Sequence, residues 1–128
     1  MKKRILIAEF HGPDGPNEMM KLYGARLEAE NHSVTVSNGR QAIRQLEAGT
    51  PWDLVLVTPD LGHFDGFEVL AAARSIRKRA WMISDDQEMK PEEVWAEKVI
   101  PRAALEAALI EGGFLPQVEI PVPAQIAA

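Results

Sequence analysis

The feature that most constrains this chain is a regular alternation of short apolar runs with segments of helical periodicity. The apolar runs occupy residues 4–10, 32–37, 52–58, 80–84 and 98–101. Runs that are apolar on both faces are typical of strands in the middle of a parallel sheet. Strands that alternate with helices predict an α/β fold, a doubly wound five-stranded parallel sheet with helices on both faces and right-handed crossovers.

Helical periodicity fills the intervals between the apolar runs. The predicted helices span residues 17–30, 39–48, 67–79 and 101–111, with a short fourth helix inside the acidic segment 85–97. Asn38 followed by Gln41 resembles a capping box, and Pro101 suits the first position of the last helix.

Length and composition indicate one domain. A chain of 128 residues with 46% apolar content can bury a single core, which we place at residues 1–113. The remainder, residues 114–128, holds Pro116, Pro121 and Pro123. Because proline interrupts helices and central strands, this tail is expected to be an extended segment.

Composition also excludes several classes of function. The chain has no cysteine, which rules out disulfides and thiolate metal sites and suits a reducing compartment. A net charge of −5 argues against binding to nucleic acid phosphates. No apolar run approaches the roughly 20 residues of a membrane span. We therefore expect a cytoplasmic protein that binds neither nucleic acid nor membrane.

In a doubly wound sheet, binding sites lie at the carboxyl ends of the strands. Here those ends correspond to residues 9–11, 58–60, 84–86 and Ile100. A flavodoxin-like site for a small molecule at this edge finds little support, because the prolines of the segment HGPDGP remove amide donors that a phosphate loop needs.

Two motifs carry a more specific signal. DLVLV in the third apolar run is followed at a defined spacing by DGFEVL, and RILIAEF, WMIS and VIP fit around them. Over residues 3–112 the sequence resembles the receiver domain of two-component response regulators. The resemblance implies an aspartate after the third strand that accepts a phosphoryl group from a histidine kinase. It also implies an acidic pair for Mg²⁺, a hydroxyl on the fourth strand and a lysine on the fifth.

The residues at those positions depart from the family. Thr58 stands at the acceptor position, Glu9 and Phe10 at the acidic pair, Ser84 at the hydroxyl and Ile100 at the lysine. Thr58 cannot form an acyl phosphate, and Glu9 leaves a cation one carboxylate where the family has three. These changes predict a degenerate pocket with no catalytic residue, no cofactor and no enzyme activity, and hence a pseudo-receiver in a phosphorelay.

An alternative keeps the phosphoryl chemistry. Asp60 or Thr58 would then be an unusual acceptor, with Mg²⁺ on Glu9 and Ser84 as the hydroxyl. Lys98 lies two residues before Ile100, so a shift in strand register would return a lysine to the pocket. His11 could add a metal ligand, although a lone histidine in such a loop is more often a turn residue. Asp65, before a glycine, is interpreted as turn chemistry.

The acidic segment 85–97 coincides with the surface that receivers use for partners. We expect the partner to be a signalling protein, such as a histidine kinase or an effector domain, or a second copy of the chain. The predicted partner face comprises Asp86, Glu88, Glu92, Glu93, Trp95, Glu97 and Lys98. The basic cluster 74–79 is interpreted as structural because cations suit the end of a helix, and Trp81 and Trp95 as core or half-buried anchors.

Overall fold

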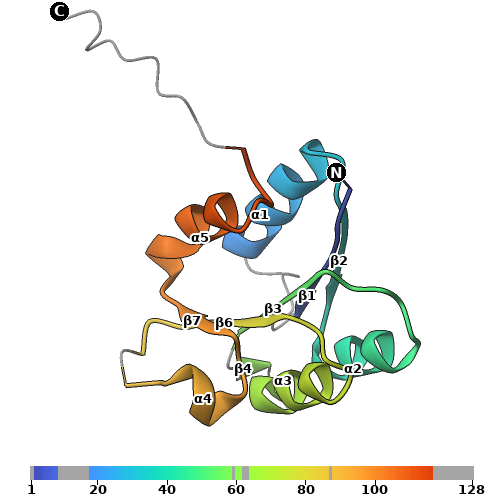
Figure 1. Cartoon of the computed structure of the whole chain (residues 1–128), viewed down its shortest axis with the longest axis vertical. Coiled ribbons are helices and arrows are strands. Elements are labelled where there is room, and N and C mark those ends of the chain that lie inside the picture. Colours follow the sequence, from blue (N-terminus) through green and yellow to red (C-terminus); the bar gives the residue numbers. More distant parts are fainter. Residues whose placement is uncertain (1, 9–17, 59, 62–63, 87, 117–128) are drawn as a thin grey trace, which may run out of the picture.

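A sheet of parallel strands runs through the centre of the molecule (Figure 1). The computed structural model describes residues 2–8, 18–58, 60–61, 64–86 and 88–116. The sheet strands are β1 (Arg4–Ala8), β2 (Ser33–Ser37), β3 (Leu54–Val57), β6 (Ala80–Ile83) and β7 (Lys98–Ile100). They pair in the order β2-β1-β3-β6-β7, and every pair is parallel. This confirms the predicted five-stranded parallel sheet.

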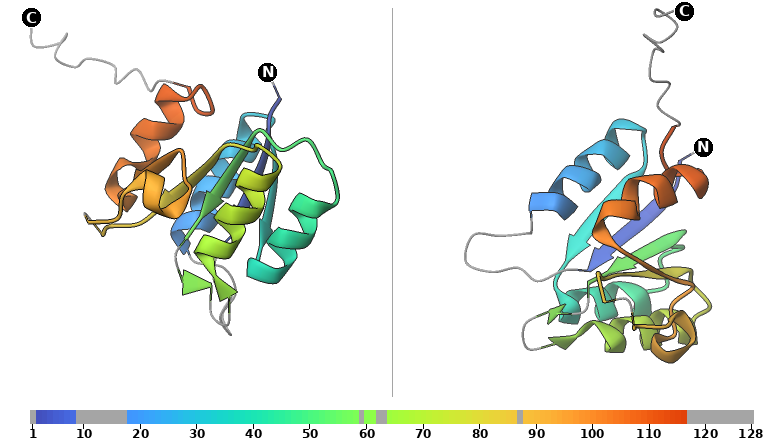
Figure 2. Two further views of the ribbon diagram at one scale, coloured as in Figure 1. Left: turned by 60° about the horizontal axis from the view of Figure 1, so that its bottom comes forward. Right: turned by 90° about the vertical axis from the view of Figure 1, so that its left-hand side faces the viewer.

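Helices cover both faces of the sheet. They are α1 (Glu18–Ala29), α2 (Gly39–Glu47), α3 (Gly66–Ser75), α4 (Pro91–Val94) and α5 (Leu105–Glu111). Helices α1 and α5 lie on one face, and α2, α3 and α4 on the other (Figures 1 and 2). The fourth helix is a single turn, as predicted. None of the described helices is long and apolar enough to cross a lipid bilayer.

The central strands are buried on both faces because their side chains supply two cores. Every residue of β3 and β6 is buried. Val55 and Val57 point to the layer that contains α2 and α3, whereas Leu54 and Leu56 point to the layer of α1 and α5. A continuous apolar run is therefore what both faces of these strands require.

Helix α3 ends four residues before its predicted end. Arg77 adopts a left-handed conformation with φ of 58°, which stops the helix. The Lys78 amide donates to the Ala73 carbonyl and the Arg77 amide to the Arg74 carbonyl, both at 2.9 Å. This pattern usually has a glycine at the left-handed position, and because Arg77 stands there instead, no local signal marks the end of the helix.

The last helix also starts later than predicted. Pro101 has an extended backbone (φ −62°, ψ 148°) and precedes a 3-10 turn, η1 (Arg102–Ala104), before α5 begins at Leu105. The Asp85 carboxylate accepts a hydrogen bond from the Arg102 amide at 2.9 Å. Because an acceptor from another loop holds the first amide of η1, the turn begins after Pro101 rather than at it.

The sequence predicts the cap of α2 but not two short strands that precede α3. The Asn38 side chain accepts from the Gln41 amide at 2.9 Å, as the capping pattern at the start of α2 predicts. Between β3 and α3, two short strands that the sequence pattern did not predict, β4 (Asp60–Leu61) and β5 (Phe64–Asp65), form an antiparallel ladder.

The packed domain extends past the predicted boundary at residue 113. Phe114 and Leu115 are buried in the α1/α5 core. The Phe114 ring meets the Trp81 ring edge to face at 5.8 Å. Gly112 makes room for this contact, since a Cβ there would lie 3.1 Å from the Phe114 ring. The segment assigned to the tail thus begins with two core residues, and of the rest the structure describes only Pro116.

The buried ring of His32 ties this segment to the start of the sheet. Its Nδ1 accepts from the Lys3 amide at 3.0 Å. Its Nε2 lies 2.8 Å from the Phe114 carbonyl oxygen. Since Nδ1 is the acceptor, the neutral ring donates through Nε2.

Truncation tests the boundary directly. A chain that ends after Gly113 loses Phe114 and should be less stable by about 3–5 kcal/mol, the cost of deleting a buried phenylalanine side chain. A matched chain that ends after Pro116 keeps both core residues and should have the same stability as the full chain. Thermal or urea unfolding followed by circular dichroism measures both. Equal stability of the two truncated chains would contradict the packing described above.

Candidate functional site

The carboxyl ends of four strands meet at one edge of the sheet. Ala8 pairs with Val57, Val57 with Met82, and Ile83 with Ile100, so β6 and β7 end one residue beyond β1 and β3 at the same edge. Beyond these pairs, the Thr58 amide donates to the Ala8 carbonyl at 3.1 Å. The register therefore places Thr58 at the predicted acceptor position. Glu9, Phe10 and His11 lie outside the described residues.

Ser84 uses its hydroxyl to turn the chain after β6. The residue is buried, and its Oγ accepts from the Asp86 amide at 3.1 Å. The Asp86 carboxylate in turn accepts from the Glu88 amide at 3.0 Å. The backbone amide of Ser84 donates to the Ile100 carbonyl at 2.9 Å. The Ser84 hydroxyl thus caps the turn that follows β6, and its backbone amide joins the end of β6 to the end of β7.

Ile100, which the resemblance aligned with a lysine, packs in the α1/α5 core with 5% of its surface exposed. Lys98 does not replace it. Lys98 pairs with Trp81, two residues before the end of β7, and its Nζ lies 5.1 Å from the Trp81 ring centroid. The shifted register that would bring Lys98 into the pocket is therefore wrong.

Asp60, the alternative acceptor, lies in β4 beyond the end of β3. Its backbone pairs with that of Asp65 in the short antiparallel ladder, and neither side chain is among those described. Asp60 follows Thr58 by two positions and lies outside the parallel sheet whose edge carries Thr58 and Ser84.

The described residues at the predicted positions of this edge do not by themselves form a site for a divalent cation. Mg²⁺ requires near-octahedral oxygen ligands and is usually held by carboxylates. The described residues at the family's positions are Thr58, Ser84 and Ile100, which offer two hydroxyls and no carboxylate. Within the described part of the chain, no three His, Cys, Asp or Glu side chains are arranged to hold a metal ion. The remaining carboxylate of the pattern, Glu9, would be alone.

The acidic part of the predicted partner face is exposed. The side chains of Asp86, Glu88, Glu92 and Glu93 all reach solvent. Trp95 is 49% exposed, because a left-handed backbone with φ of 61° ends α4 at this residue. Trp95 is therefore not a core residue and keeps about half of its surface in solvent, whereas Trp81 is completely buried in the core.

Glu97, assigned to the same face, belongs to a cluster that sequence reasoning missed. Its carboxylate binds Arg79 through Nε and Nη2, the latter at 2.9 Å, and accepts from Trp81 Nε1 at 3.0 Å. The hydrogen bond from Arg79 is the main cause that lowers the pKa of Glu97, and it raises the pKa of Arg79. The sequence does contain a signal for this ion pair. Arg79 directly precedes β6 and Glu97 directly precedes β7, and neighbouring parallel strands bring their starts together.

Acid should weaken this cluster. The pKa of Glu97 lies below its ordinary value of 4.5 in the folded chain, so the pair stabilises the fold above about pH 4.5 and that contribution is lost as pH falls further. Both side chains are more than a third exposed, so the effect is at most about 1 kcal/mol. Glu97→Gln should lower the melting temperature at neutral pH and converge with the wild type in acid.

Melting curves between neutral and acid pH provide the measurement. Glu28→Gln, at an exposed glutamate of α1 with no ion pair to a described residue, is the matched control and should follow the wild type throughout. If Glu97→Gln and Glu28→Gln had the same pH profile, Glu97 would not carry the stabilisation assigned to it.

Comparisons with known proteins agree on the fold. No protein-family model matches the chain. Over 79 residues, 61% of the chain, it is 39% identical to the transcriptional regulatory protein TcrA of Mycobacterium tuberculosis. The chain spans only 28% of the length of that curated relative.

Solved structures resemble the whole domain. The receiver domain of a sensor histidine kinase from Pseudomonas aeruginosa, with magnesium in its active-site cleft, has a TM-score of 0.66 at 20% identity, over 87% of this chain and 97% of that one. A CheY-like response regulator receiver domain from Methanospirillum hungatei gives 0.68 at 20%, over 88% and 94%. The response regulator TrrA of Thermotoga maritima, bound to Mg²⁺ and beryllofluoride, gives 0.68 at 18%, over 88% and 99%. The chain has the receiver fold, as its resemblance implied.

Proposed function

We propose that this chain is a receiver-like binding module of two-component signalling that does not take up a phosphoryl group. The observation that carries the proposal is Thr58 directly after β3, where a receiver presents its acceptor carboxylate. A threonine hydroxyl without a neighbouring base is a poor nucleophile and cannot give an acyl phosphate. Ser84 and Ile100 support the proposal, because one is engaged in a turn and the other in the core.

Without phosphoryl chemistry, the module would act by binding alone. A ligand shifts a protein between two conformations only by binding one of them more tightly. The acidic face around α4, exposed at Asp86, Glu88, Glu92 and Glu93, is the surface we assign to this role. A histidine kinase or an effector domain in the cytoplasm is the partner class we favour, since the structural relatives include the receiver domain of a sensor histidine kinase.

Phosphorylation can be tested on the intact chain. The protein is incubated with Mg²⁺ and acetyl phosphate, and separately with beryllofluoride, while intact mass and tryptophan emission are recorded. We expect no added phosphoryl mass and no saturating Mg²⁺-dependent change, because Thr58 replaces the acceptor and Phe10 replaces one residue of the acidic pair. A phosphorylatable receiver domain, treated in parallel, is the positive control.

The opposite result would identify the alternative function. A phosphoryl adduct that disappears in Asp60→Asn, or in Thr58→Val, would show a noncanonical acceptor and overturn the proposal. A Mg²⁺ response abolished by Glu9→Gln would do the same for the cation.

The partner face has its own test. In Glu92→Lys combined with Glu93→Lys, two exposed charges of α4 are reversed, and partners recovered with the tagged chain should be lost. Glu28→Lys combined with Glu30→Lys makes the same change of net charge at α1 and serves as the control. Circular dichroism checks that both variants are folded. Partners that survive the α4 reversal as well as they survive the α1 reversal would contradict the assignment.

A further inference from the structure

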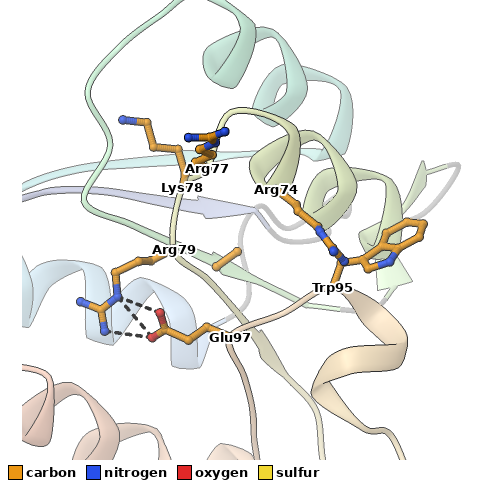
Figure 3. Close-up of a pocket in the computed structure, with 7 residues that line it drawn as sticks. Arg74, Arg77, Lys78, Arg79, Trp95 and Glu97 are labelled. Carbon is orange, nitrogen blue, oxygen red and sulfur yellow. Dashed lines mark hydrogen bonds and ion pairs between the residues drawn. The ribbon is translucent and has the colours of Figure 1, made fainter.

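A groove of about 470 Å³ opens at the amino-terminal edge of the sheet, at the opposite end of the strands from Thr58 (Figure 3). It lies between the end of α3, the start of β6 and the end of α4. Arg74, Arg77, Lys78 and Trp95 line it, and the Arg79–Glu97 pair closes one end. An adjoining hollow, lined by Ala71, Ser75 and again Arg74 and Trp95, extends it along α3.

Two of the lining residues stand where the backbone favours glycine. Among the described residues other than glycine, positive φ occurs at Asn31, Arg77 and Trp95. Asparagine tolerates the left-handed region, but a long or bulky side chain there is uncommon and strained. Arg77 and Trp95 both line this groove. Such strain clusters at functional sites, where a side chain is needed despite its conformation.

The groove is also locally basic in an acidic chain. The net charge of the chain is −5, yet Arg74, Arg77 and Lys78 gather within five residues. None of the three forms an ion pair with a described residue, whereas Arg79 binds Glu97. Figure 3 shows the Arg74 side chain extending toward Trp95. The dipole of α3 favours a cation in its last turn but does not require an arginine in the left-handed position after it.

The openness of the groove indicates what kind of ligand it fits. The side chain of Arg79 is 47% exposed and Trp95 is 49% exposed. Small-molecule sites enclose most of their ligand, and this surface is too open to do so. Tryptophan and arginine are instead the residues that most often dominate protein–protein binding energy.

We propose that this groove binds an acidic peptide segment of a partner protein. Carboxylates of the segment would contact Arg74, Arg77 and Lys78, and an apolar side chain would pack on Trp95 and Ala71. The charge of the ligand follows from the unpaired cations, and its apolar residue from the exposed indole. The groove adjoins the acidic face around α4 at Trp95, but none of Asp86, Glu88, Glu92 and Glu93 lines it. It would serve whether or not the chain accepts a phosphoryl group.

The probe is a labelled synthetic peptide in which glutamates flank a single leucine, and its anisotropy is followed as the full chain is added. Binding should weaken as salt is raised, because exposed charge contacts are screened. A peptide with lysines in place of the glutamates should not bind. Trp95 should report binding by its emission, since Trp52 and Trp81 are 6% and 0% exposed.

The decisive variant is Arg77→Gly. It removes a cation and relieves the left-handed strain, so the peptide should bind about three- to fivefold more weakly while the melting temperature stays equal or rises. Arg77→Lys should keep most of the affinity, and Trp95→Ala should lose about tenfold or more. Arg102→Gly removes the same charge at the opposite edge of the sheet and should bind like the wild type.

Three results would overturn the proposal. The first is the absence of saturable binding of the acidic peptide, and the second is unchanged affinity in Arg77→Gly. The third is self-association of the chain that Arg77→Gly abolishes, which would assign the groove to a second copy. Because no phosphoryl donor is present, any of these outcomes leaves the proposed function to its own tests.

Discussion

The indole of Trp81 is the interaction on which much of this structure depends. Trp81 is the second residue of β6. Its indole is completely buried and donates the Nε1 hydrogen to the Glu97 carboxylate. Its ring meets Phe114 edge to face and lies beneath the Lys98 ammonium. One side chain thus connects the start of β7 and the segment after α5. An indole can do this because its body is apolar while its single polar group still needs an acceptor.

Much of the fold could be predicted from the sequence because continuous apolar runs leave few arrangements other than a covered parallel sheet. The parts that could not be predicted depend on contacts between distant segments. Asp85 delays the start of the last helical turn by capping Arg102, and Phe114 joins the core through Trp81, and neither contact has a local signature. Arg77 ends α3 in a left-handed conformation, at a position where a glycine would have indicated the end of the helix.

The candidate site also has residues whose position could be predicted from the sequence and others whose position could not. Alignment of the motifs sufficed to place Thr58, Ser84 and Ile100 at one edge, since parallel register brings equivalent strand ends together. The surroundings of Glu97 and Trp95 could not be predicted, because their exposure depends on side-chain partners and on one left-handed residue rather than on periodicity. The two edges of the sheet consequently differ in character. At the carboxyl edge Thr58, Ser84 and Ile100 are uncharged, whereas the amino edge concentrates cations beside an exposed indole.

The hydrogen bonds of His32 have a mechanical consequence. The ring bridges the Lys3 amide, just before β1, and the Phe114 carbonyl, just after α5. The chain therefore enters the sheet and leaves the core at points held together by a single imidazole. Tension applied at Leu115 would act on the amino end of β1 through this ring, without first unwinding α5. The two hydrogen bonds of the His32 ring would thus transmit such a force to an interior strand of the sheet.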